Sequence, residues 1–456
     1  MNASEKYLLG SSFFLTSTVL QVLCYKRKQH ERKIRMSKKL KLLIFILCLA
    51  ALSLNGCAKN ADSEVQGSDT AAAITNPRQI VAADNKTART IMWEAKVKQP
   101  YTLEYRLQGS KDIQAVQATD SSFTDKNSII QYTARLSGLV PGCAYEYRIS
   151  TAQNKGRWHK LQTESGAGFT ALIFPDSQSA NYSGWQQLAR EAYKRHPESA
   201  FYVNMGDLVD NGQDASQWCA WFNSVSVFSD AVPLAPVIGN HEAYSLEWKE
   251  CLPASYTHLF NVPQNGLAKY PNQFYSFDYG SVHFVVLDTN FPEMQKYQPD
   301  LLADELPWLE KDLAASKAKW KVVLMHRDIF LYGFGPESGR AQSKTHFLDF
   351  SYRLMPVFEK YKVDAVLTAH LHTYRRRVPL QNFAPAPQGA GITYILTGVA
   401  GDVRYPKLWG DFAWDAATAP KPETANYMTL TADGKTLEFK AFLPDGKQFD
   451  EVKLTK

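Results

Sequence analysis

The feature that most constrains this chain is a series of short apolar segments that each run into Asp, Asn or His. Five such segments occur between residues 171 and 372, and they are rich in Val, Ile, Leu, Ala and Phe. Short apolar runs of this kind are typical of buried strands. We expect strands at 171–174, 201–205, 236–238, 321–325 and 365–369, and the polar residues that follow them are Asp176, Asp207, Asn240, His241, His326, His370 and His372.

Segments with helical spacing lie between these strands, at 185–195, 216–228, 307–313 and 352–361. Pro307 suits the first turn of its helix. Alternating strands and helices favour an α/β layered domain, which we place at residues 168–456. Ligands bind at the carboxyl ends of strands in such sheets, so the polar side chains are expected to converge on one edge.

The joint arrangement matters more than any single residue. A Gly-Asp pair such as Gly206-Asp207 is, taken alone, more typical of a solvated turn. Five strand ends with carboxylate, amide and imidazole groups instead indicate a metal site, and this mixed oxygen and nitrogen set suits Zn, Mn or Fe. The chain shows no Ser elbow and no P-loop that would offer a protein nucleophile or a phosphate cradle.

Residues 77–165 have a different hydropathy pattern, in which apolar and polar residues alternate. Half-buried strands are expected at 91–94, 101–107 and 145–149, separated by turn residues such as Pro141-Gly142. Many short strands within about ninety residues favour a β-sandwich. The expected fold is therefore an N-terminal β-sandwich followed by the α/β layered domain.

The N-terminal region reads as a targeting segment. Residues 36–57 combine a basic start, an apolar stretch and Gly56-Cys57, which is the layout of an export signal. They resemble a bacterial lipoprotein signal, which would place a lipid on Cys57 and anchor the exported protein to the cell envelope. A plain signal peptide or an uncleaved anchor are the alternatives. Residues 1–35 are interpreted as an upstream mis-start and residues 58–76 as a tether.

Charge argues against a nucleic-acid partner. The whole chain has a net charge of +6, but residues 1–57 hold ten Lys and Arg against two Glu, so the rest of the chain is net acidic by two charges. A small net negative charge on residues 58–456 gives no reason to expect attraction to nucleic acid, which is itself negatively charged.

Three cysteines follow the N-terminal segments. Cys219 and Cys251 could form a disulfide in an exported protein, which would leave Cys143 as a single thiol, but the sequence leaves the pairing open. The C-x-x-C spacing is absent from the sequence, so a thiolate metal cluster is not expected.

The ordered motifs resemble those of the calcineurin-like metallophosphoesterases. With the preceding β-module, the chain is similar to the purple acid phosphatases, whose N-terminal domain is fibronectin type III-like. The resemblance covers roughly residues 77–456 and implies a phosphoesterase domain whose sheets are sandwiched between helices. The motifs that carry it are Asp176, Gly206-Asp207, Gly239-Asn240-His241-Glu242, His326 and His370-Leu371-His372.

The resemblance implies a role for each motif residue. Asp207 would bridge two metal ions. His241 would not bind metal but would donate a proton to the leaving oxygen. The first ion would be bound by Asp176 and His372, and the second by Asn240, His326 and His370.

Two positions depart from the family pattern. Asp210 stands where purple acid phosphatases carry a tyrosine, and Gln178 stands where the wider superfamily usually has a histidine. We expect Gln178, Asp210 or water to complete the first metal shell. Without the tyrosine, two divalent ions (Fe, Mn or Zn) are expected rather than a ferric site.

Substrate contacts are less well specified. Arg327, Arg375 and His346 are candidate phosphate contacts, although a structural salt bridge is an equal alternative for each arginine. Residues 243–272 and 331–346 are expected to line the pocket.

The expected function is an acid phosphatase-like phosphomonoesterase acting on small phosphate esters. A phosphodiesterase, or a surface binding protein with a degenerate site, are the alternatives. Oligomeric state stays open.

Overall fold

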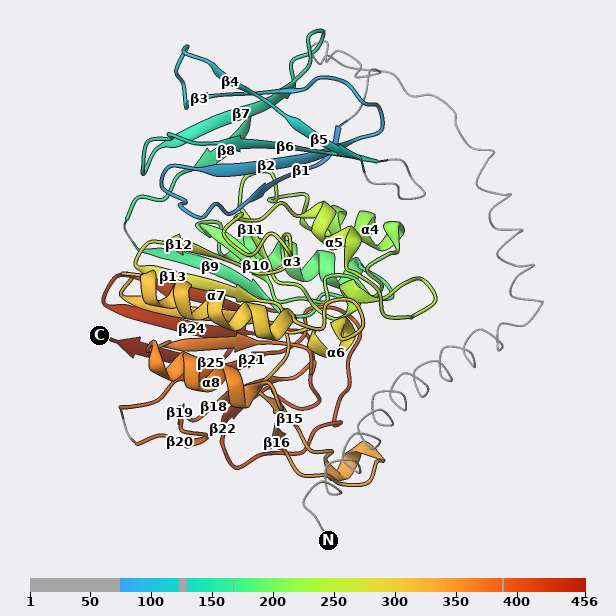
Figure 1. Cartoon of the computed structure of the whole chain (residues 1–456), viewed down its shortest axis with the longest axis vertical. Helices are drawn as coiled ribbons and strands as arrows, with labels where there is room; N and C mark the ends of the chain where they lie inside the picture. Colours follow the sequence, from blue (N-terminus) through green and yellow to red (C-terminus); the bar gives the residue numbers. More distant parts are fainter. Residues whose placement is uncertain (1–73, 123–128, 167, 388) are drawn as a thin grey trace, which may run out of the picture. The chain divides into compact units, whose positions relative to one another are not determined.

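The computed structural model describes residues 74–122, 129–166, 168–387 and 389–456. The predicted mis-start, the signal with Cys57 and most of the tether lie outside the described residues. The described part is built around two large sheets, with helices α7 and α8 running beside the second (Figure 1). None of its helices is long and apolar enough to cross a membrane.

The larger sheet has ten strands in the order β25-β24-β23-β9-β10-β11-β1-β2-β6-β5. Strands β9, β10 and β11 are parallel neighbours, with Val203 opposite both Ile173 and Ala235. The strands are β25 (Gln448–Thr455), β24 (Thr436–Phe442), β23 (Tyr427–Ala432), β9 (Phe169–Phe174), β10 (Phe201–Asn204), β11 (Leu234–Pro236), β1 (Ile74–Ile80), β2 (Arg89–Ala95), β6 (Ile130–Leu136) and β5 (Thr119–Ser122).

The second sheet has seven strands in the order β12-β13-β14-β17-β21-β18-β22. Its central strands β13, β14, β17 and β21 are parallel. The strands are β12 (Tyr275–Tyr279), β13 (Val282–Leu287), β14 (Trp320–Met325), β17 (Ala365–Thr368), β21 (Thr393–Thr397), β18 (Tyr374–Arg377) and β22 (Asp415–Thr418). Two short hairpins pair β15 (Phe330–Leu331) with β16 (His346–Phe347), and β19 (Leu380–Gln381) with β20 (Ala384–Pro385).

The two large sheets share one core. Side chains alternate across a strand, so Val322 and Leu324 of β14 belong to the core that includes β9 and β10, whereas Val323 and Met325 belong to the core under α7 and α8. The sheets are thus sandwiched between helices, as expected. The helices are α3 (Ser183–Arg195), α4 (Ala215–Val225), α5 (Ala254–Leu259), α6 (Phe291–Met294), α7 (Leu301–Ala315) and α8 (Ser351–Lys360), with 3-10 helices η1 (His241–Ala243) and η2 (Pro336–Ser338).

The N-terminal β-sandwich is confirmed. Its second sheet, β4-β3-β7-β8, packs against β2 and β6 around Trp93, Tyr132 and Tyr147. Its first sheet continues into the α/β layered domain, because Ile80 of β1 pairs in parallel with Leu234 of β11. The strands are β3 (Thr102–Leu107), β4 (Gln114–Gln117), β7 (Ala144–Ser150) and β8 (His159–Gln162).

Two local predictions were wrong. Strand β11 begins and ends two residues before the predicted 236–238, because its ladder with β10 ends where Asn204 pairs with Pro236. Pro307 lies inside α7 rather than in its first turn, since the helix begins six residues earlier at Leu301. Buried Leu301, Leu309 and Leu313 hold the helix on the second sheet despite the hydrogen bond that a proline cannot donate.

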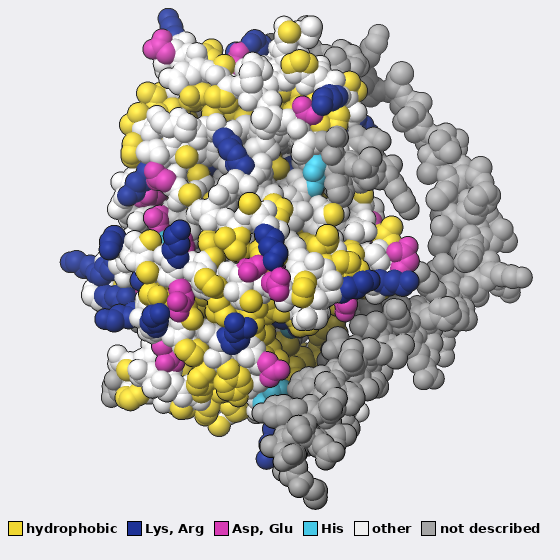
Figure 2. Space-filling model, viewed as in Figure 1, with side chains coloured by type: hydrophobic (Ala, Val, Ile, Leu, Met, Phe, Trp, Pro, Cys, Tyr) yellow, Lys and Arg dark blue, Asp and Glu magenta, His cyan; other side chains and the backbone are white. Residues whose placement is uncertain are grey.

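Basic and acidic side chains are interspersed over most of the face shown in Figure 2. A group of basic side chains lies at the left edge of that face.

Candidate metal centre

The polar strand ends meet, but they come from two sheets rather than one. Asp176 and Asp207 follow β9 and β10 of the ten-stranded sheet, whereas His326 and His370 follow β14 and β17 of the seven-stranded sheet. The prediction of a single sheet edge was therefore wrong. The two sheets pack face to face on one core, so the carboxyl ends of both sets of parallel strands still lie close to each other.

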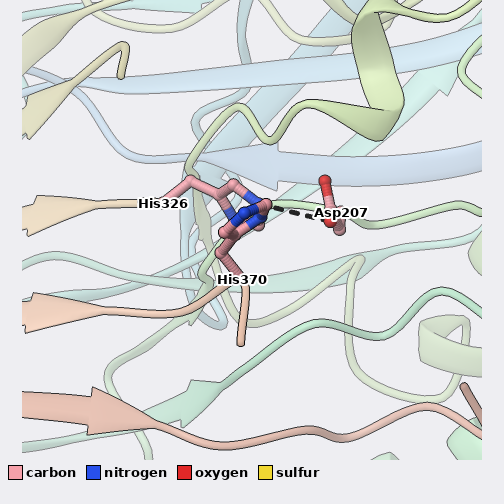
Figure 3. Close-up of side chains that lie close together, drawn as sticks. All are labelled: Asp207, His326 and His370. Carbon is pink, nitrogen blue, oxygen red and sulfur yellow. Dashed lines mark ion pairs between the residues drawn. The ribbon is translucent and has the colours of Figure 1, made fainter. Parts of the chain in front are cut away.

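Two groups of donor atoms form there, and Asp207 belongs to both. In one group, atoms of Asp207, His326 and His370 lie within 4.8 Å of one another (Figure 3). In the other, atoms of Asp176, Asp207 and His372 do so. His326 Nε2 is 3.2 Å from Asp207 Oδ2, and His372 Nε2 is 2.9 Å from Asp176 Oδ2. The shared carboxylate gives the cluster the layout of two adjacent cation positions.

Asn240 joins the group around His326. Its Oδ1 is 3.1 Å from His326 Nε2, and its side chain is 6% exposed. Thus all six side chains that the family resemblance names as metal ligands lie in or against the two groups. The structure does not include metal ions, and the roles of the six residues stay predictions.

The main chain is strained at this cluster. Asp207 (φ 47°), His370 (φ 77°) and His372 (φ 54°) all adopt the left-handed region that non-glycine residues rarely occupy. Such residues cost of order 1–3 kcal/mol each and persist only where their surroundings hold them. His370 is held by its own N–H, which donates to Asp176 at 3.1 Å.

Two glycines are required by close approach. A Cβ on Gly206 would lie 2.4 Å from His326 Nδ1, and one on Gly239 would lie 2.2 Å from Asp207 Oδ1. The Gly-Asp and Gly-Asn-His-Glu motifs therefore pack against each other through their glycines. Any larger residue before Asp207 or Asn240 would clash, which explains why each motif begins with glycine.

Glu242 supports the cluster from beneath and was given no role by sequence reasoning. It is fully buried, and its carboxylate accepts main-chain N–H groups of Asp207 (3.0 Å), Leu208 (2.9 Å), Val209 (3.4 Å) and Gly239 (2.8 Å). Burial and the neighbouring Asp207 raise the pKa of Glu242, while the Gly239 N–H opposes that shift. A signal was available, because a glutamate three residues after Gly239 can reach back to its N–H.

Main-chain carbonyls orient two of the histidines. His326 Nδ1 lies 2.9 Å from Met205 O, and His372 Nδ1 lies 2.5 Å from Val403 O. A carbonyl can only accept, so each Nδ1 carries a proton and each Nε2 is the nitrogen that faces the carboxylates. This arrangement is the usual one for histidines that bind metal.

The electrostatics fit a cationic ligand. Burial opposes ionisation of Asp207, but His326 and His241 hold the pKa of Asp207 well below its usual range. Burial, followed by Arg327 and His326, lowers the pKa of His370, which keeps its imidazole in the neutral form that binds metal. His370 Nδ1 is buried without a hydrogen-bond partner among the described residues. Burial opposes protonation of His326, but Asp207 outweighs it and raises the pKa of His326 to about 9, so metal binding there displaces a proton. A donor set of oxygen and nitrogen atoms suits Zn, Mn or Fe.

His241 stands beside the two groups rather than in them. Its Nδ1 lies 2.7 Å from Asp210 O, and its Nε2 lies 3.9 Å from Asp207 Oδ2. Burial opposes protonation, but Asp207 and Asp210 outweigh it and raise the pKa of His241. The ring therefore keeps its proton to higher pH and directs Nε2 at the cluster.

The two departures from the family pattern both lie next to His241. Gln178 Nε2 is 3.5 Å from His241 Nε2, and Asp210 Oδ1 is 3.8 Å from His241 Nδ1. Burial raises the pKa of Asp210, whose Oδ1 has no hydrogen-bond partner among the described residues. Neither side chain belongs to a donor group, so their predicted part in the first metal shell stays a prediction.

The three candidate phosphate contacts have different surroundings. Arg327 reaches the cluster, with Nη1 3.1 Å from His370 Nε2 and Nη2 2.5 Å from Glu293 Oε1. Arg375 is 1% exposed and pairs with Asp415 at 2.5 Å, so it has the structural salt bridge that was the alternative. His346 is exposed in β16, and neither residue has a contact with the donor groups.

The cysteines do not form the pair considered from the sequence. Cys143 and Cys251 are reduced thiols in the structure, so Cys251 is not joined to Cys219. Cys251 Sγ instead accepts a hydrogen bond from Gln213 Nε2 at 3.2 Å.

Comparison with known proteins agrees with this geometry. Residues 161–374 match the family model of the calcineurin-like phosphoesterases, and residues 76–163 match that of the purple acid phosphatase N-terminal domain. Human acid phosphatase type 7 is 25% identical over 342 residues, which cover 68% of this chain and 74% of that protein. Purple acid phosphatase 23 of Arabidopsis thaliana is 30% identical over 213 residues, which cover 44% of this chain but 40% of that protein.

A solved structure shows the same fold. The purple acid phosphatase PPD1 from yellow lupin (Lupinus luteus) seeds aligns with a TM-score of 0.71 at 18% identity, covering 84% of this chain and 74% of that chain. The two family models, the relatives and the fold agree. The chain therefore combines a purple acid phosphatase N-terminal domain with a calcineurin-like phosphoesterase domain, and it is similar to the purple acid phosphatases over both.

Proposed function

We propose that this chain is a dinuclear-metal hydrolase of phosphate esters, with phosphomonoesters as its preferred substrates. The observation that carries the proposal is the pair of donor groups that share Asp207, with His241 directed at them from one side. When bound, two divalent ions would polarise the phosphoryl oxygens and make a water molecule acidic enough to attack at neutral pH. Asp176 and His372 would hold one ion, and Asn240, His326 and His370 the other.

In the reaction, a water oxygen forms a new bond to phosphorus while the bond from phosphorus to the leaving oxygen breaks. The leaving oxygen then needs a proton, and His241 is the group that can supply it. Because Asp210 O accepts from Nδ1, the proton available to substrate is the one on Nε2. Positioned proton transfer of this kind contributes roughly 10²–10⁴-fold to rate.

Arg327 has the position of a phosphate contact. Its guanidinium is held by the buried Glu293, which leaves Nη1 at the edge of the donor groups beside His370. A guanidinium fixed in this way can donate to a phosphoryl oxygen without losing side-chain freedom on binding. Glu293 thereby acts as a positioning residue.

Kinetics with a matched control tests the proposal. The metal-depleted protein would be reconstituted with Zn, Mn or Fe(II) and assayed with 4-nitrophenyl phosphate and bis(4-nitrophenyl) phosphate. We expect turnover only with metal and faster with the monoester. His241→Ala is expected to lose roughly 10²–10⁴-fold in kcat, whereas His346→Ala, an exposed histidine outside the cluster, keeps wild-type rates.

Each alternative has its own outcome. Faster cleavage of the diester would favour the phosphodiesterase. Lack of turnover with every metal would favour the degenerate binding protein. Activity that survives Asp207→Asn and His241→Ala together would refute the mechanism.

We further propose that the protein is exported and held at the cell envelope by a lipid on Cys57. The lipoprotein-like signal at residues 36–57 supports this. Cys57→Ser should release the protein from the membrane fraction. A variant that stays in that fraction would contradict the lipid anchor.

A further inference from the structure

Two aromatic side chains, Tyr244 and Trp248, lie against the proposed proton donor. The His241 ring is 5.8 Å from the Tyr244 ring at 81° and 5.8 Å from the Trp248 ring at 84°, measured between centroids. The two aromatic rings are 6.2 Å apart and tilted by 42°. All three side chains are half-buried, and Tyr244 Oη donates to Glu293 Oε1 at 3.3 Å, the carboxylate that also holds Arg327.

The loop that carries Trp248 is anchored on several sides. Tyr244 and Glu250 form an antiparallel bridge at its base. Asn211 Nδ2 donates to Ser245 O at 2.7 Å, and Tyr297 Oη donates to Glu250 O at 2.8 Å. A loop held in this way presents its tip in a defined place, which is what a binding surface requires.

Trp248 itself has a strained main chain. Its φ of 59° lies in the left-handed region, which is a genuine outlier for a bulky residue. The Trp248 N–H donates to Ser245 O at 2.8 Å, and this short turn maintains the strain. Strained residues cluster at ligand sites, where the surroundings hold a side chain in a required position.

We propose that Tyr244 and Trp248 form a leaving-group subsite that selects phosphomonoesters of flat, apolar alcohols, such as aryl and arylmethyl phosphates. The inference rests on the proposed function and specifies its substrate class. The leaving oxygen must lie next to His241 to receive its proton, so the organic group bonded to that oxygen extends from the same point. The two aromatic rings that lie against His241 are Tyr244 and Trp248, and stacked or edge-to-face ring contacts would hold an aromatic group there.

An aromatic ring also lies against a histidine of the other donor group. Tyr405 lies 5.0 Å from the His372 ring and is 39% exposed. Aromatic rings therefore accompany both the proton donor and a proposed metal ligand. Contact with such rings would favour binding of an apolar leaving group, whereas a strongly hydrated leaving group would lose its hydrogen bonds to water without replacement.

The test compares benzyl phosphate with ethyl phosphate, because their alcohols have similar acidity and differ mainly in the ring. The variant is Trp248→Gly, since glycine accepts a positive φ and folding is not penalised by the main chain. Trp248→Phe keeps a ring, and Leu246→Ala is the control, because Leu246 is exposed on the same loop. The mature, metal-loaded protein is used throughout.

We expect the wild type to favour benzyl phosphate in kcat/KM. Trp248→Gly should lower the benzyl-to-ethyl ratio by about tenfold, which is the discrimination an apolar pocket typically gives. Trp248→Phe should restore most of the ratio, and Leu246→Ala should leave it at the wild-type value. Calorimetry should show that Trp248→Gly weakens binding of benzylphosphonate, which cannot be hydrolysed, far more than binding of inorganic phosphate.

Two results would overturn the inference. One is an equal loss for benzyl and ethyl phosphate in Trp248→Gly, which would mean that the ring only supports His241. The other is a wild type that hydrolyses both esters without preference. Failure of the proposed function looks different, because the wild type would then hydrolyse neither ester with any metal.

Discussion

Replacing Glu242 by glutamine probes how the candidate centre is held. The change keeps the shape of the side chain but removes its charge and turns one oxygen into an NH₂ group. That group must face two of the four main-chain N–H donors that now meet the carboxylate. We expect the NH₂ to face Leu208 and Val209, because the Val209 contact is the longest at 3.4 Å and its loss is the least costly.

The magnitude follows from these contacts. A hydrogen bond to a charged group contributes about 1.5–3 kcal/mol. Glu242→Gln loses the 2.9 Å bond from Leu208 outright and the weaker one from Val209, and it turns the bonds from Asp207 and Gly239 into neutral ones. We therefore expect the free energy of unfolding to fall by about 3–4 kcal/mol. Metal affinity should fall about 10- to 100-fold, since Asp207 loses its support.

Burial and Asp207 raise the pKa of Glu242 to about 7. The first effect is therefore measured above that pH, where the carboxylate is charged, by urea unfolding of the metal-free protein followed by tryptophan fluorescence. Glu247→Gln is the matched control, because Glu247 is an exposed glutamate five residues along the chain, and a change within about 0.5 kcal/mol is expected there. If Glu242→Gln unfolds within about 0.5 kcal/mol of the wild type, the four contacts do not stabilise the centre and the reasoning is wrong.

Three further predictions concern other parts of the fold. Asp207→Asn should lower the metal content from about two ions per chain to one or fewer, as measured by elemental analysis; retention of both ions would contradict a shared carboxylate. Burial disfavours a charged His283, but hydrogen bonds to Asp278 and Asp312 raise the pKa of His283 to about 9. This stabilisation, about 3 kcal/mol, is complete below the unfolded pKa near 6.5 and disappears as pH rises through 9. Melting temperatures should therefore drop across that window in the wild type but not in His283→Gln. Asp328→Ala should cost about 3–5 kcal/mol in urea unfolding, because it leaves its buried arginine partner unpaired; a loss below about 1 kcal/mol would show that the ion pair is dispensable.

Much of the fold could be predicted because its signals are local. Apolar runs such as 171–174 and 201–205 have the length and composition of buried strands whatever surrounds them, and β9 and β10 contain them almost residue for residue. Element ends were less predictable. The end of β11 depends on the length of its partner β10, and the start of α7 depends on leucines that pack in the core of the second sheet.

The contacts of individual charged side chains could not be predicted from the sequence either. Arg327 and Arg375 each follow a histidine motif, yet one lies at the donor groups and the other is buried against Asp415. The difference is set by which acid each guanidinium meets, and those acids, Glu293 and Asp415, lie 34 and 40 residues away along the chain.

By itself, the sequence determined which residues carry donor atoms, because a strand that ends in Gly-Asp or His-x-His places those groups at a sheet edge through local geometry alone. Only the tertiary structure decided that two sheets supply them, that Asp207 lies in both donor groups, and that Glu242 supports them. These features depend on contacts between segments tens to hundreds of residues apart, which packing of the shared core brings together.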